Sequence, residues 1–219
     1  MPIIATNESK SLPIVEPGTH IARCVQMIHV GTIKEQFEDK DIIKNVVRVT
    51  FEIPGVTHTF DESKGAEPRL LSKEFTLSLN PKATLRKFLD TWRGKPFTPE
   101  QANKFDVSTL IGVPCMLSIG KKTSAKNKEY NTIDSAIAVP NGVPVPDAFN
   151  QLVEINFDNI AEHFKIIPNY IVDKIKTTPE YQQCGFTFPD SGENSTENVS
   201  TDENTSTEQK APETDEMPF

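Results

Sequence analysis

Alternating apolar and polar residues predict three β-strands in the first half of the chain. Residues 18–30 are rich in β-branched side chains, and their apolar positions fall on both phases, which indicates a long strand with a bend or bulge. Residues 43–53 and 71–79 show a clean period of two, so one face of each strand is expected in the core. The expected inward side chains are Val47, Val49, Phe51, Ile53, Phe75, Leu77 and Leu79.

After the third strand the hydrophobic period changes from two to that of a helix. Asn80 and Pro81 suit the N-cap and first position of a helix, and Gly94 suits its end. The apolar stripe between them consists of Leu85, Phe88, Leu89 and Trp92. A second short helix is predicted over residues 99–104, followed by strands over 113–120 and 129–139.

The remaining segments are read as connections and appendages. Residues 31–42 and 56–69 are polar and predict loops, and residues 140–156 predict an extended connection. Two short helices are expected at 158–165 and 169–177, with Ile160, Phe164, Ile171, Val172 and Ile175 packing on the barrel or on a second subunit. The predicted organisation is an N-terminal arm (1–17), a β-domain (18–146), a helical extension (147–186) and a disordered acidic tail (187–219).

The net charge of −8 is distributed very unevenly. Residues 187–219 carry nine acids and one lysine, for −8; residues 147–186 carry −3, and residues 1–146 carry +3. A mildly basic body with an acidic tail is the asymmetry expected of a protein whose body meets a polyanion.

The last residues carry the most specific motif. Asp215 and Glu216 precede Met217, Pro218 and Phe219, so a terminal carboxylate follows an aromatic residue behind a proline and two acids. A peptide of this kind suits a partner protein in which an apolar pocket binds the aromatic ring and a basic rim binds the carboxylates. This ending resembles the acidic tip of bacterial and phage single-stranded DNA-binding proteins. The alternative is a terminus whose acids only solubilise the chain.

The predicted order of three strands, a helix and two strands is also similar to the OB-fold, a five-stranded barrel that binds oligonucleotides. The fold class expected is therefore mainly β: an OB-fold barrel with a helix between strands 3 and 4, short C-terminal helices and a disordered tail. The resemblance implies a non-catalytic protein that coats single-stranded DNA during replication, recombination or repair. It also implies a tip that recruits partner enzymes, and the departures from the bacterial plan favour a phage origin.

Candidate DNA contacts follow from this plan. Cations and hydroxyls are expected on the polar face of strands 2 and 3, on the hairpin between strands 4 and 5, and beside a few stacking aromatics. The candidates are Lys44, Arg48, Thr50, Phe60, Lys73, Lys121, Lys122, Lys126, Lys128 and Tyr130, with Ser72 and Phe37 as further possibilities. A solvated hairpin tip is the alternative reading of the lysine-rich segment. Phe51, Phe75 and Trp92 share the phase of aliphatic residues and are expected in the core.

Other chemistry finds little support in the sequence. No nucleotide-binding loop, hydrolase motif or zinc motif occurs, and the four histidines lack metal-ligand spacing, so neither an enzyme nor a cofactor is expected. Asp61, Glu62 and Asp134 leave a nuclease-like site open, and a phage protein-interaction module is the stronger alternative. The three separated cysteines and the lack of a signal peptide or long apolar run predict a cytoplasmic protein, in the bacterial host, without disulfides or membrane spans. It could form homo-oligomers.

Overall fold

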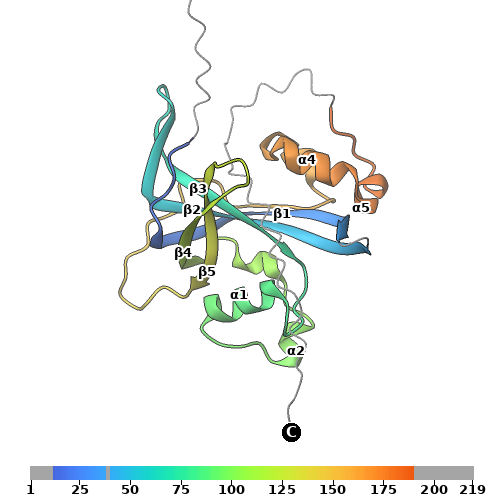
Figure 1. The fold of residues 1–219 in the computed structure, drawn as a ribbon, viewed down its shortest axis with the longest axis horizontal. Helices are drawn as coiled ribbons and strands as arrows, with labels where there is room; N and C mark the ends of the chain where they lie inside the picture. Colours follow the sequence, from blue (N-terminus) through green and yellow to red (C-terminus); the bar gives the residue numbers. More distant parts are fainter. Residues whose placement is uncertain (1–11, 38–39, 190–219) are drawn as a thin grey trace, which may run out of the picture.

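Five antiparallel strands form a strongly curled, half-barrel sheet that helices cover on both faces (Figure 1). The computed structural model describes residues 12–37 and 40–189. The strands are β1 (Gly18–Phe37), β2 (Lys40–Asp61), β3 (Gly65–Thr76), β4 (Pro114–Thr123) and β5 (Glu129–Ile137). They lie in the order β3-β2-β1-β4-β5, and a short sixth strand, β6 (Val153–Ile155), pairs in parallel with β1.

The curl of the sheet is introduced by bulges in its longest strands. The pairing of β1 with β2 shifts register between Cys24 and Gln26 and again between His29 and Gly31. Each extra residue bends the strand and increases its twist, so β1 can pair with β4 through its first residues and with β6 further on. The bulge expected from the two-phase apolar pattern of β1 is therefore confirmed.

The concave side of the sheet holds the main core, closed by α1 (Thr84–Arg93). Phe51, Phe75 and Trp92 are all buried, as their sequence phase predicted, and the Phe88 ring lies between them. The helix starts later than expected because Asn80 Oδ1 accepts the Lys82 N–H at 3.1 Å and so stabilises a turn before the helix. Gly94 ends α1 with a left-handed φ of 67°, as predicted.

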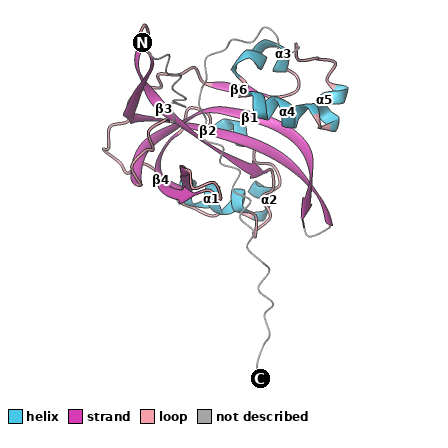
Figure 2. Cartoon of the chain, turned by 45° about the horizontal axis from the view of Figure 1, so that its top comes forward, coloured by secondary structure: helices cyan, strands magenta, loops and turns pink. Residues whose placement is uncertain are grey.

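The connection from α1 to β4 contains α2 (Pro99–Ala102) and the 3₁₀ turn η1 (Val107–Leu110). Beyond β5, the C-terminal extension (residues 140–189) crosses to the convex side of the sheet. It contains β6, α3 (Ile160–His163), η2 (Phe164–Ile166), α4 (Asn169–Lys176) and α5 (Pro179–Gln183). Figure 2 shows the two groups of helices on opposite sides of the sheet. β6 and α5 were not predicted.

The extension has its own apolar core against β1 and β2. Ile160, Ile171 and Ile175 are buried there against Ile28 and Val30 of β1. The sequence left open whether these helices pack on the barrel or on a second subunit, and the structure packs them on the sheet of their own chain. Glu180 fastens α5 to β1 through the Thr32 N–H at 3.0 Å and the Thr32 hydroxyl at 2.5 Å.

Two segments predicted as polar loops are strand instead. Residues 56–69 form most of a long β2–β3 hairpin, whose turn is stabilised by Asp61: it accepts the Ser63 N–H at 2.9 Å, and Gly65 takes a φ of 80°. Residues 31–37 and 40–45 extend β1 and β2 into a two-stranded ribbon with a Lys34–Asp41 ion pair of 2.7 Å. Both predictions were wrong because these strands are stabilised by backbone pairing and polar contacts. Their sequences therefore lack the alternation of apolar and polar residues from which a strand is predicted.

Strands β3 and β5 stand at the two ends of the strand order, and side chains close the seam between them. Lys73 Nζ of β3 donates to the Ile133 carbonyl of β5 at 2.6 Å. The N-terminal strap (residues 12–17) crosses the same seam. The Asn131 side chain accepts the Val15 N–H at 2.8 Å and donates to the Val15 carbonyl at 2.7 Å, and Arg69 donates to the Pro13 carbonyl at 3.4 Å. The half-barrel is thus closed by a lysine and a strap instead of a β-ladder.

Candidate nucleic-acid interface

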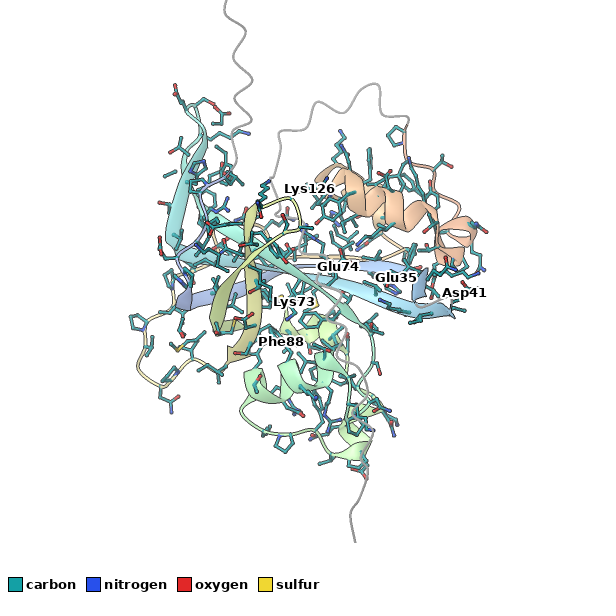
Figure 3. The ribbon with its side chains drawn as sticks, viewed as in Figure 1. Glu35, Asp41, Lys73, Glu74, Phe88 and Lys126 are labelled. Atoms are coloured by element: carbon teal, nitrogen blue, oxygen red, sulfur yellow. The ribbon has the colours of Figure 1, made fainter. Side chains whose placement is uncertain are left out.

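The β4–β5 hairpin presents the densest group of exposed cations among the predicted site residues. Lys122, Lys126 and Lys128 are exposed at its tip, and Figure 3 shows Lys126 at the end of this hairpin. The tip is an ordered turn: the Ser124 N–H donates to the Lys128 carbonyl at 2.8 Å, and Asn127 adopts a φ of 56°. An ordered turn holds the lysines at one end of the sheet, where a phosphate backbone could lie along them.

The base of this hairpin combines a cation with an aromatic ring. Lys122 and Tyr130 are cross-strand partners, and Tyr130 is half-buried. Directly opposite strand residues have Cβ atoms about 5 Å apart, so a cation and an aromatic ring stand next to each other here. Lys121 is partly neutralised by Glu129 at 2.8 Å, and this hydrogen-bonded ion pair raises the pKa of Lys121.

The β2–β3 hairpin carries the second predicted aromatic, Phe60. Its side chain is 41% exposed, and its ring lies edge-on to His58 with centroids 4.9 Å apart. The Arg69 guanidinium lies 5.9 Å from the Phe60 ring centroid, within the range of a cation–π contact. An exposed ring held by a neighbouring ring and a cation has the chemical character of a surface on which an unpaired base can stack.

The N-terminal strap lies between these two hairpins. It contacts Asn131, which follows Tyr130 in β5, and Arg69, which lies beside Phe60. In Figure 1 the dark-blue start of the described chain runs beside the β2–β3 hairpin. Burial of Val15, about 1.5–3 kcal/mol, is its main apolar contribution. Its hydrogen bonds to Asn131 and Arg69, and that between the Glu16 carbonyl and the His20 ring, each add about 0.5–1.5 kcal/mol.

The polar face of strands 2 and 3 was expected to be open, and it is covered. Arg48 is 3% exposed with its guanidinium 5.2 Å from the Tyr170 ring of α4, and burial lowers the pKa of Arg48. Thr50 is buried and bonded to Ser72 at 3.0 Å, while Lys174 of α4 pairs with Glu74 at 2.8 Å.

The covering extension buries six large apolar side chains against the sheet, and burial of each is worth roughly 1.5–3 kcal/mol. These side chains are Ile155, Ile160, Ile167, Ile171, Ile175 and Phe188. Arg48 lies against Tyr170 of α4 and Thr50 is bonded to Ser72, so neither side chain is open to solvent in this fold.

Two other predicted lysines are engaged within the sheet. Lys44 lies in the β1–β2 ribbon and forms an ion pair with Glu35. Lys73 reaches the core side of β3, 5.4 Å from the Phe75 ring and 5.8 Å from the Phe88 ring, and donates to Ile133. Figure 3 shows Lys73 beside Phe88, well away from the exposed tip at Lys126. The structure therefore brings together Lys121, Lys122, Lys126, Lys128 and Tyr130, with Phe60 on the neighbouring hairpin.

Other predicted residues lie outside what the structure describes. The tip at residues 215–219 and the side chain of Phe37 are among them. No part of their predicted roles is tested by the structure.

Two of the carboxylates considered for catalysis, Asp61 and Asp134, are bonded locally. Hydrogen bonds from the backbone and then the side chain of Ser63 lower the pKa of Asp61, and Asp134 accepts from the Thr132 hydroxyl at 2.9 Å. Within residues 12–37 and 40–189, no three His, Cys, Asp or Glu side chains gather in a metal-binding arrangement. The three cysteines are free thiols, and burial raises the pKa of Cys24 to about 12.

Sequence reasoning missed the role of Glu52, on the convex face of the sheet. Glu52 is fully buried and accepts the Phe149 and Asn150 N–H groups at 2.9 and 2.8 Å, which fixes the connection that leaves Phe149 61% exposed. Only the position of a glutamate inside a regular strand hinted that Glu52 needs donors from elsewhere in the chain. Nothing in the sequence indicated that the Asn131 side chain bonds to the Val15 backbone. A side-chain amide that bonds to a distant backbone segment leaves no local sequence pattern.

The described helices include none with the length and apolar character needed to span a bilayer. Comparison of the chain with protein-family models, with curated proteins and with solved structures found no match.

Proposed function

We propose that this chain is a sequence-nonspecific single-stranded DNA-binding protein whose strand-binding surface lies on the β4–β5 and β2–β3 hairpins. The order β3-β2-β1-β4-β5, with α1 between β3 and β4, is compatible with an OB-fold barrel, and oligonucleotide-binding barrels of that type use the 4–5 loop. The seam between β3 and β5, closed by Lys73 and the strap, takes the place of the last ladder of such a barrel.

The observation that carries the proposal is the exposed cationic hairpin beside an aromatic ring. Residues 121–130 hold four lysines, one glutamate and one tyrosine, and the described turn directs the lysines to the surface. Phosphates would pair with Lys122, Lys126 and Lys128, and a base would stack on Tyr130 or Phe60, at about 1–3 kcal/mol per base. Binding of this kind reads no base edge, so it is independent of sequence.

The acidic tail completes the proposal. Its sequence, ending in Asp215 to Phe219, fits a peptide that recruits replication, recombination or repair proteins, in a phage-encoded protein acting in the bacterial cytoplasm. The body would hold DNA while the tip would hold a partner.

The test is a titration of fluorescent oligo-dT with a triple variant, Lys122→Gln, Lys126→Gln and Lys128→Gln. Losing three phosphate contacts should weaken binding about ten- to hundredfold at low salt. The matched control carries Lys82→Gln, Lys87→Gln and Lys104→Gln, three exposed lysines on the α1–α2 side of the sheet, and should bind like the wild type.

Equal losses in both triple variants would show that overall charge, and not this hairpin, attracts DNA. Wild-type affinity in the hairpin variant would remove the hairpin from the site. Circular dichroism of both variants should match the wild type, because all six lysines are exposed.

A further inference from the structure

The N-terminal strap offers the same chemical groups to the site that a DNA strand would offer. The Pro13 carbonyl accepts from Arg69 at 3.4 Å, and Glu16 is an exposed carboxylate whose charge helps to raise the pKa of Lys121. Carbonyl and carboxylate oxygens are acceptors for cations, as phosphate oxygens are. The strap therefore places a carbonyl acceptor on Arg69 and a carboxylate charge near Lys121, one cation on each hairpin.

The strap is also the least firmly held segment on this part of the sheet. It buries one apolar side chain, Val15, whereas the C-terminal extension buries a whole apolar cluster against β1 and β2. Its two prolines, Pro13 and Pro17, leave few N–H groups for pairing, and its polar contacts are with side chains instead of a β-ladder. Among the described segments that cover the sheet, it is the one that a ligand could displace at modest cost.

We propose that residues 12–17 act as an intramolecular competitor for the strand-binding surface, occupying the seam in the free protein and leaving it when single-stranded DNA binds. This inference rests on the proposed function. With such competition, the apparent association constant for DNA equals the intrinsic constant multiplied by the fraction of molecules whose seam is open. DNA binding is thereby coupled to release of the strap.

Val15 reports the state of the strap directly. In the free protein its side chain is 1% exposed and its N–H is bonded to Asn131, so its methyl NMR signals should be displaced from unfolded-chain positions and its amide should exchange slowly. Adding oligo-dT to the full chain should move the Val15 methyl signals to unfolded-chain positions. Val47, buried in the same core on β2, should keep its signals and serves as the internal control.

The two proposals fail in different ways in this experiment. Oligo-dT that does not bind overturns the proposed function and this inference with it. Oligo-dT that binds while the Val15 signals stay in place overturns the inference alone.

A variant gives a second measurement without disturbing the core. Glu16→Gln removes the strap's negative charge at an exposed position near Lys121 and should tighten oligo-dT binding about two- to fivefold at low salt, the size of one exposed charge interaction. Glu162→Gln, an exposed acid on α3, is the matched control and should leave the affinity unchanged. Equal affinities for wild type and Glu16→Gln, or equal gains in both variants, would contradict a specific competition by the strap.

Discussion

At the scale of single residues, Lys73 shows how a sequence pattern can be right while the residue type misleads. Lys73 shares the phase of Phe75, which period-two alternation placed in the core, yet a lysine is ordinarily expected at the surface. The structure follows the phase: the aliphatic stem lies near the core rings and the ammonium reaches Ile133 across the seam. A lysine tail can do this because its stem is apolar and only its end needs an acceptor.

This geometry predicts a stability loss when the ammonium is removed. Lys73→Met keeps the apolar stem and leaves the Ile133 carbonyl without its donor, so the free energy of unfolding should fall by about 1–3 kcal/mol. Urea unfolding followed by circular dichroism measures this. Lys87→Met, on the exposed side of α1, should change it by less than about 0.5 kcal/mol. Identical unfolding midpoints for Lys73→Met and the wild type would show that the seam does not depend on this contact.

At the scale of elements, the strands with alternating apolar residues were predictable and the polar ones were not. The cores of β2, β3 and α1 followed from periodicity because burial of one face dictates residue type. The β2–β3 hairpin and the β1–β2 ribbon have little buried surface, so their pairing rests on backbone bonds and contacts such as Lys34–Asp41. The covering of Arg48 by α4 was equally invisible, because it joins β2 to residues more than one hundred positions away.

The anchor between α5 and β1 gives a pH prediction. Burial would raise the pKa of Glu180, but hydrogen bonds from the Thr32 hydroxyl and N–H outweigh it and lower that pKa below its ordinary value of 4.5. A lowered folded-state pKa means that the anchor stabilises docking above about pH 4.5, and that this contribution is lost as the pH falls through the folded-state value.

Hydrogen exchange of α5 amides should therefore accelerate between pH 5 and pH 3, after correction for the intrinsic pH dependence. In Glu180→Gln, exchange should be faster at pH 5 and should show no such acceleration on acidification. Equal acceleration in the wild type and the variant would place the acid-sensitive group elsewhere.

At the scale of the whole molecule, the predicted order of strands and helices was largely confirmed. The prediction that the polar face of strands 2 and 3 is open to solvent was wrong. Three strands, a helix and two strands occur in the expected order, and the apolar helices of the extension pack on the sheet. Periodicity identifies which residues are buried within an element, but it does not show which face a distant segment will cover. The extension covers the convex face, where the sequence predicted DNA contacts on strands 2 and 3, so the proposed interface lies instead on the hairpins at one end of the sheet.

The most direct test of strand binding is the salt dependence of wild-type affinity for oligo-dT, compared with a duplex of equal length. We predict binding to oligo-dT at 50 mM salt, with the logarithm of the association constant falling linearly against the logarithm of salt concentration, at about −0.7 per phosphate contacted. The duplex should bind more weakly, because its stacked bases are not available to Tyr130 and Phe60. Absence of oligo-dT binding at low salt, affinity that ignores salt, or equal affinity for the duplex would contradict the account.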